Sequence, residues 1–174
     1  IVYVSNGVYA GNFHLTPGTT LRSVTTNIAS VVIDGGGAGR VLDRVTLSLP
    51  SWYLYASSSN TWVVSCTVTN GDAGAEDGGG LRNINASNCI ITANAALHGG
   101  GATLSKMYNS EISFNSAYDG GGSYLCQLWN CTVAGNTLSG GAGGGSKNST
   151  LVNSISWDNG AIDVFGTGSS NYYS

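Results

Sequence analysis

The chain has 174 residues, a formal net charge of -3 and only 9% charged residues, far below the ~25% of an average soluble domain. This weak negative charge offers no basic patch, so we expect no nucleic-acid partner. No apolar run reaches the roughly 18 residues of a membrane helix, so we expect no membrane span. The length suits a single domain.

The first part of the chain predicts short strands separated by turns. Val, Ile, Leu and Tyr cluster in short runs, whereas Asn6-Gly7 and Pro17-Gly18 have the composition of turns. These runs predict strands over residues 2–4, 13–15, 21–24, 31–33, 45–47 and 53–55. We interpret residues 1–64 as irregular N-terminal coils of the solenoid predicted below.

A repeat organises residues 65–160. Glycine triplets begin at Gly78, Gly99, Gly120 and Gly143, at spacings of 21, 21 and 23 residues. An asparagine follows each triplet after eight residues, and a second follows after six more. The first column is Asn88, Asn109, Asn130 and Asn153, and the second is Asn94, Asn115, Asn136 and Asn159. A fixed period of this length is typical of a solenoid, in which each coil buries its apolar face against the next.

The segments between the glycines predict strands rather than helices. They are short, rich in Val, Ile, Thr and Ser, and broken by Gly and Asn, without helical periodicity. We therefore predict an all-β parallel β-helix with roughly eight coils of about 22 residues, stacked ~4.8 Å apart. Residues 1–174 would form one domain, with residues 161–174 as a fraying or capping end.

Stacking turns each repeated position into a column of side chains. We expect both asparagine columns to point inward, because amide side chains can hydrogen-bond from coil to coil. An aliphatic column is expected at Val68, Ile91, Ile112 and Val133. The cysteines Cys66, Cys89 and Cys131 share a column, and Cys126 lies in another. Coil spacing does not suit a disulfide, so we expect buried free thiols.

One column carries residues capable of chemistry. Asp77, His98 and Asp119 precede three successive glycine triplets and would lie in a line at ~4.8 Å intervals. Two carboxylates beside a histidine could act as a general acid and base, or Asp77 and Asp119 could bind a divalent cation such as Ca²⁺. The alternative is a polar corner without chemistry, in which case no cofactor is expected.

Aromatic residues form a second candidate site. Tyr108 and Trp129 occupy one column in adjacent coils, and Tyr124 belongs to the same coil as Trp129. An exposed pair of aromatic rings can bind sugar rings or a partner chain. Packing against a neighbouring domain would explain the same pair.

Several motifs resemble those of a known family. The run Val32-Ile-Asp-Gly-Gly-Gly-Ala-Gly-Arg-Val41, the repeated Asn-Cys-x-Ile/Val-x-x-Asn and the Gly-Gly-Gly triplets resemble bacterial secreted right-handed parallel β-helix repeat proteins. Ile112-Ser-Phe-Asn115 and Gly100-Gly-Ala-Thr103 are more loosely similar to the passenger repeats of chlamydial polymorphic outer membrane proteins. The resemblance implies a right-handed β-helix at or outside the cell surface. It does not imply one activity, because the fold hosts adhesins, surface passengers, lyases and hydrolases.

Three functional hypotheses remain open from the sequence. The first is a non-catalytic extracellular or cell-surface module with a structural or adhesive role and a glycan or cell-surface ligand. The second is a carbohydrate-active lyase or hydrolase, or a fragment of one, with Asp77, His98 and Asp119 as its site. The third is a subunit that self-associates end to end into a filament, because an open β-helix exposes unpaired strand edges.

Overall fold

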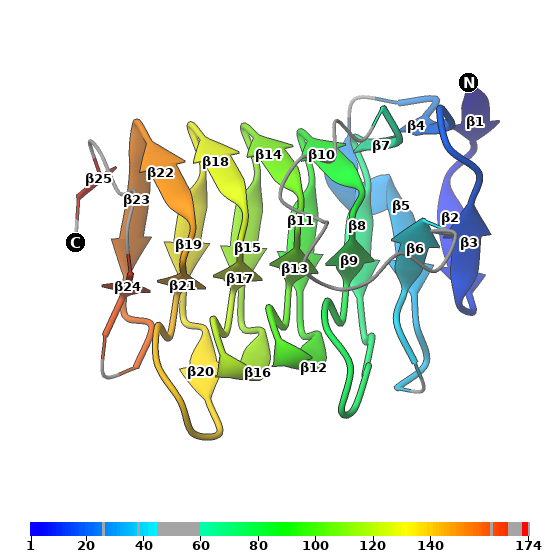
Figure 1. Cartoon of the computed structure of the whole chain (residues 1–174). Coiled ribbons are helices and arrows are strands. Elements are labelled where there is room, and N and C mark those ends of the chain that lie inside the picture. The colour runs from blue at the N-terminus through cyan, green and yellow to red at the C-terminus, as the bar shows by residue number, and fades with distance from the viewer. Residues whose placement is uncertain (26, 38, 45–59, 161, 167–171, 174) are drawn as a thin grey trace.

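The computed structural model describes residues 1–25, 27–37, 39–44, 60–160, 162–166 and 172–173. The chain forms a parallel β-solenoid of about seven turns of about 21 residues, which confirms the predicted fold class with slightly fewer and shorter coils. The coils follow one another from the N-terminal to the C-terminal end of a single row (Figure 1). The strands predicted over residues 45–47 and 53–55 lie outside the described residues.

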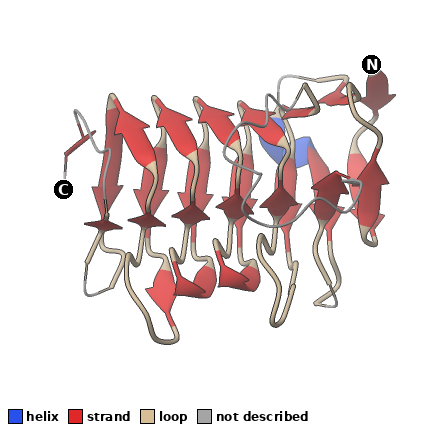
Figure 2. Ribbon diagram, viewed as in Figure 1, coloured by secondary structure: helices blue, strands red, loops and turns tan. Residues whose placement is uncertain are grey.

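Three long parallel sheets and one short sheet, here called A to D, run along the solenoid (Figure 2). Sheet A contains β1 (Val2–Val4), β4 (Thr20–Ser23), β7 (Trp62–Val64), β10 (Asn85–Ser87), β14 (Lys106–Tyr108), β18 (Gln127–Trp129) and β22 (Thr150–Val152). Sheet B contains β2 (Gly7–Ala10), β5 (Val31–Asp34), β8 (Thr67–Thr69), β11 (Ile90–Thr92), β15 (Glu111–Ser113), β19 (Thr132–Ala134), β23 (Ser154–Trp157) and β25 (Tyr172–Tyr173).

Sheet C contains β3 (Phe13–Leu15), β6 (Leu42–Arg44), β9 (Leu81–Arg82), β13 (Ala102–Thr103), β17 (Ser123–Tyr124), β21 (Ser146–Lys147) and β24 (Val164–Phe165). Sheet D contains β12 (Ala95–His98), β16 (Ser116–Asp119) and β20 (Thr137–Leu138). A 3-10 turn, η1 (Ile28–Ser30), precedes β5. No helix in the described ranges is both long and apolar enough to cross a bilayer.

Each regular coil turns at corners where one residue has a left-handed backbone. The Asn88 column supplies one corner, with φ of 57°, 48°, 53° and 50° at its four members. Ala93, Phe114, Gly135 and Asp158 supply a second, Asn83, Leu104, Leu125 and Asn148 a third, and the first glycine of each triplet a fourth. Gly and Asn adopt this conformation at little cost, which explains the corner composition of the repeat.

The second glycine of each triplet has a different role. A Cβ atom on Gly100 would lie 2.6 Å from the carbonyl oxygen of Gly121 and still closer to that of Ser116. Backbones therefore approach here more closely than any side chain permits. The third glycine packs on the inner asparagines: a Cβ on Gly101 would lie 3.0 Å from Nδ2 of Asn115. The triplet is thus one left-handed corner followed by two positions of close packing.

Inward-facing aliphatic columns fill the interior. The predicted column Val68, Ile91, Ile112 and Val133 is fully buried, and its members pair directly through sheet B. Sheet A contributes Val63, Ala86, Met107, Leu128 and Leu151. Sheet C contributes Leu42, Leu81 and Ala102, followed by the serines Ser123 and Ser146, whose hydroxyls lie 2.8 Å apart.

The second asparagine column forms the predicted inward ladder. Asn94, Asn115, Asn136 and Asn159 are at most 1% exposed. Oδ1 of Asn115 accepts hydrogen bonds from Nδ2 and from the backbone amide of Asn94, both at 3.0 Å. The same pair of bonds recurs at each following step, and the carboxylate of Asp163 closes the series by accepting from Asn159.

The first asparagine column does not point inward, so this part of the prediction is wrong. Asn88, Asn109, Asn130 and Asn153 are exposed at a left-handed corner. The reason is geometric: the corner residue itself points outward, and the next residue, Cys or Ser, points inward. Asn130 still donates to Asn109 at 3.2 Å, and Asn153 donates to Asn130 at 2.6 Å. The column is therefore a ladder on the outer surface.

All four cysteines are free and buried. Burial raises the pKa of Cys66 and Cys131 to about 11 and that of Cys89 and Cys126 to about 12, against weaker lowering by backbone hydrogen bonds. The thiols therefore stay protonated and pack as small apolar groups.

Removing one member of the inner ladder should destabilise the solenoid strongly. In Asn115→Ala, the backbone amide of Asn94 and the carbonyl of Ile91 lose their partner in a dry interior. We expect a loss of about 3 kcal/mol or more in the free energy of unfolding, measured by urea denaturation. Asn109→Ala is the matched control: it removes an exposed asparagine and should cost about 1 kcal/mol. Equal losses in both variants would contradict the assigned role of the inner ladder.

Candidate functional site

The structure brings the predicted column Asp77, His98 and Asp119 together. Sheet D holds two of its members, because β12 ends at His98 and β16 ends at Asp119, directly paired with each other. Asp77 joins through an isolated parallel bridge to His98. Nδ1 of His98 lies 2.6 Å from Oδ1 of Asp77, and Nε2 lies 3.7 Å from Oδ2 of Asp119. The imidazole therefore sits between two carboxylates.

Lys147 extends this line of charges by one coil. Its Nζ lies 2.7 Å from Oδ1 of Asp119, and the same oxygen accepts a hydrogen bond from the backbone amide of Ala142. Burial alone would raise the pKa of Asp119, but the hydrogen bonds from Lys147 and Ala142 and the charges of Lys147 and His98 together hold it below its ordinary value of 3.8. Asp119 is thus ionised and paired at neutral pH.

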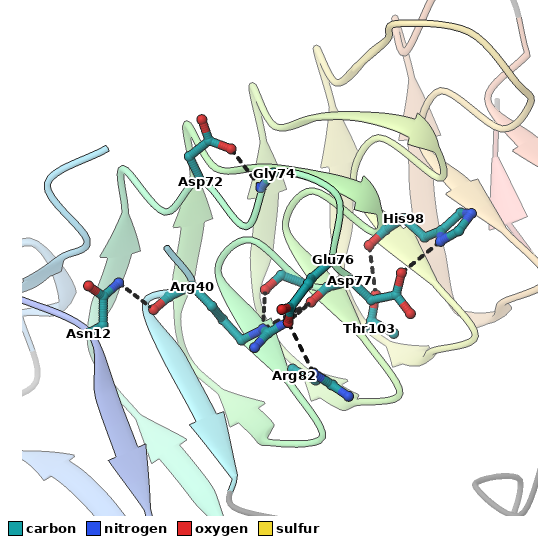
Figure 3. Close-up of polar contacts among 10 residues, drawn as sticks. Asn12, Arg40, Asp72, Gly74, Glu76, Asp77, Arg82, His98 and Thr103 are labelled. Carbon is teal, nitrogen blue, oxygen red and sulfur yellow. Dashed lines mark hydrogen bonds and ion pairs between the residues drawn. The ribbon is translucent and has the colours of Figure 1, made fainter. Parts of the chain in front are cut away.

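A second ionic group, formed by Arg40, Glu76 and Arg82, lies beside Asp77 at the other end of the line. Nη2 of Arg40 lies 2.9 Å from Oε2 of Glu76, and the Arg40 guanidinium also donates to the backbone carbonyls of Asp77 and Gly78 (Figure 3). Arg82 lies 3.6 Å from the same carboxylate. The hydrogen bond and charge of Arg40, with a smaller effect of Arg82, lower the pKa of Glu76. Arg40 thus anchors the loop that presents Asp77.

These contacts form a series of ionisable side chains from coil to coil along the glycine corner, here called the charge series. Asp77 and Asp119 do not meet each other, because His98 lies between them. The arrangement therefore gives no support to a cation held by Asp77 and Asp119, including Ca²⁺. Within the described ranges, no group of three or more His, Cys, Asp or Glu side chains is placed to hold a metal ion.

The aromatic site divides into two parts. Tyr108 and Trp129 pair through sheet A, and their rings stack with centroids 4.8 Å apart and an interplanar angle of 4°. Tyr124 does not join them: it belongs to sheet C, and its ring stacks on His98 at 5.0 Å. Sequence analysis missed Trp62, which lies 5.9 Å from Tyr108 in a tilted contact. Trp62 belongs to a different column from Tyr108, because it pairs with Asn85 of the intervening strand β10, whereas Tyr108 pairs with Ser87.

The near-parallel stack determines which ring surfaces can reach a ligand. The faces between Tyr108 and Trp129 cover each other, whereas each ring is only partly buried. The neighbouring outward column carries Lys106 and the exposed Gln127. The candidate site on sheet A is therefore a narrow strip of stacked aromatic rings beside polar side chains.

No protein-family model, no curated protein and no solved structure matches this chain. The fold is therefore established by the structure, and function has to be argued from the surface itself.

The charge series should make stability depend on pH through Asp119. Because the folded pKa of this carboxyl lies below 3.8, its stabilising effect is complete above that value and disappears as the pH falls through the folded pKa. At pH 7, Asp119→Asn should lower the free energy of unfolding by about 1–2 kcal/mol. The gap between wild type and variant should close below pH 4, measured by denaturant titration at several pH values.

The control for this prediction is the partner, Lys147. At pH 7, Lys147→Met should lose much of the free energy of unfolding that Asp119→Asn loses. The double variant Asp119→Asn with Lys147→Met should lose less than the sum of the two single losses, because both substitutions remove the same ion pair. Additive losses, or a gap that stays constant down to pH 2, would show that the Lys147 pair does not stabilise the fold.

Proposed function

We propose that this chain is a non-catalytic solenoid module that acts at or outside the cell surface and binds a glycan through the aromatic strip of sheet A. The observation that carries the proposal is the stack of Tyr108 on Trp129, with Trp62 in tilted contact with Tyr108, on the outer face of a scaffold with a fixed register. Partly exposed aromatic rings on rigid strands are typical of binding surfaces.

The polar atoms of the stack suit a ligand rich in hydroxyl groups. The phenol of Tyr108 and the indole N–H of Trp129 lie on ring edges, and stacked rings present their edges outward. Lys106 and Gln127 add donors and an acceptor in the next column. A glycan chain lying along the solenoid axis would meet these groups on successive coils.

The charge series favours a structural role over catalysis. A catalytic acid or base has to reach the substrate, whereas Asp119 is already paired with Lys147 and the amide of Ala142. Asp77 is likewise bound to His98. Pairing of this kind ties neighbouring coils together and explains the three residues without a reaction.

Replacing Trp129 at the end of the strip should weaken glycan binding. We expect Trp129→Ala to reduce retention of the protein on a glycan array by about tenfold, because Tyr108 loses its stacked partner and the ligand loses the indole. Tyr118→Ala is the matched control, since this exposed aromatic residue lies on sheet D. Equal losses of glycan binding in both variants, or binding unaffected by Trp129→Ala, would contradict the proposal.

Two further measurements, the glycan array with His98→Ala and an assay for released oligosaccharides, separate binding from catalysis. His98→Ala should leave glycan binding unchanged, and wild-type protein incubated with acidic polysaccharides and Ca²⁺ should release no oligosaccharides. Release that stops in His98→Ala would establish the lyase or hydrolase alternative.

A specific observation also favours the second candidate function, end-to-end association. β1, β2 and β3 are edge strands of their sheets among the described residues, and the first coil exposes Ile1 (74%), Val2 (50%), Tyr3 (63%) and Val8 (67%). Apolar edge strands of this kind are templates for pairing.

If these edges pair with another copy, light scattering should grow with protein concentration, because a heterologous stack does not close on itself. Val2→Lys together with Val8→Lys should suppress that growth while the chain stays folded. Scattering that is independent of both concentration and the substitutions would remove this candidate.

A further inference from the structure

Phe114 occupies an unusual position on the corner between sheets B and D. Its backbone is left-handed, with φ of 55°, a conformation that strains bulky residues. The same corner is occupied in other coils by Asn70, Ala93, Gly135 and Asp158, which are small or polar. Yet the Phe114 side chain is 71% exposed. Burial does not compensate for the strain here, as it can for the partly buried Leu104 and Leu125 at another corner.

The next coil is adapted to this ring. A Cβ atom on Gly135 would lie 2.8 Å from Cε1 of Phe114, so the phenyl ring extends over Gly135 toward the following coils. Two coils beyond Phe114, Trp157 projects from the sheet B position paired with Ala134 and is 53% exposed. Ala134 and Gly135 are thus a floor of small residues between two exposed aromatic side chains.

Polar groups border this surface. Ile155 (47% exposed) lies in one outward column with Thr132 and Glu111. Asp158 is exposed at the same corner as Phe114. The surface therefore combines aromatic rings with hydroxyl and carboxylate acceptors, and the only charges among these residues are negative.

We propose that Phe114 and Trp157 form a second binding site, specific for a neutral oligosaccharide. Within the described ranges, no aromatic ring stacks on either of these two side chains, unlike those of the sheet A stack, so a sugar ring can lie against them. Thr132, Asp158 and Oε2 of Glu111, whose Oε1 already accepts from Oγ of Ser113, can accept hydrogen bonds from sugar hydroxyls, whereas the two carboxylates disfavour uronic acids. A purely apolar ligand would leave these polar groups unpaired. The site extends the proposed glycan-binding role but lies on a different sheet from Trp129.

The test uses a variant that separates binding from folding. Phe114→Asn replaces the strained ring with the residue found at this corner in Asn70, so its thermal midpoint should equal or exceed that of wild type. Affinity for neutral hexasaccharides of β-linked glucose, mannose or xylose, measured by calorimetry, should fall at least tenfold. Trp157→Ala should weaken binding similarly, Tyr118→Asn should not, and polygalacturonate should bind more weakly than the best neutral probe.

Several outcomes would overturn the proposal. A lower thermal midpoint for Phe114→Asn would show that the ring is a packing residue. Failure of all three neutral probes, or tighter binding of polygalacturonate, would exclude a neutral glycan. Self-association abolished by Phe114→Asn in sedimentation would assign the surface to a second copy. If Trp129→Ala abolishes binding of the neutral probes and Phe114→Asn does not, only the sheet A strip is a site, and the present proposal fails. If Phe114→Asn abolishes binding and Trp129→Ala does not, only the Phe114 surface is a site, and the sheet A proposal fails instead.

Discussion

The inner asparagine ladder is the interaction on which the rest of the structure depends. Each amide oxygen accepts from both the side chain and the backbone of the asparagine in the preceding coil, so one residue type satisfies two donors in a dry interior. The third glycine of each triplet must be free of a side chain, because a Cβ atom there would lie 2.6 Å from a backbone carbonyl oxygen of the next coil and would also press on the ladder. The ladder and the glycines therefore pack against each other inside each regular coil.

This arrangement fixes the register and thereby the outer surface. Because coils stack without offset, residues about 21 positions apart become direct neighbours, and charges unrelated in local sequence form pairs. His98 meets two carboxylates for this reason, whereas Lys147, which pairs with Tyr124 in sheet C, reaches Asp119 from a different column. In a chain with 9% charged residues, such pairing leaves few charges to keep neighbouring molecules apart. The outer columns therefore decide what the solenoid contacts.

The sequence predicted features that repeat and missed those that do not. The period, the aliphatic column, the inner ladder, the free thiols and the Asp77, His98 and Asp119 alignment all follow from counting residues. The outward orientation of Asn88 and its equivalents could not be predicted by counting, because side chains do not alternate strictly between the inner and outer faces at a left-handed corner. The contacts of Lys147 and Trp62 were missed because each crosses columns: Lys147 pairs with Tyr124 in sheet C but reaches Asp119 of sheet D, and Trp62 pairs with Asn85 but reaches Tyr108.

The two aromatic surfaces illustrate how a regular scaffold can carry different functions on different faces. On sheet A, stacking of Tyr108 on Trp129 is itself stabilising, so the strip has a structural explanation in addition to any ligand. At the Phe114 corner the position in the repeat favours Gly or Asn, and an exposed phenyl ring gains little from packing. Strain retained where a better residue is available within the same repeat is evidence of a role outside folding. Phe114 is thus a stronger indication of function than the charged column, whose contacts are accounted for within the solenoid.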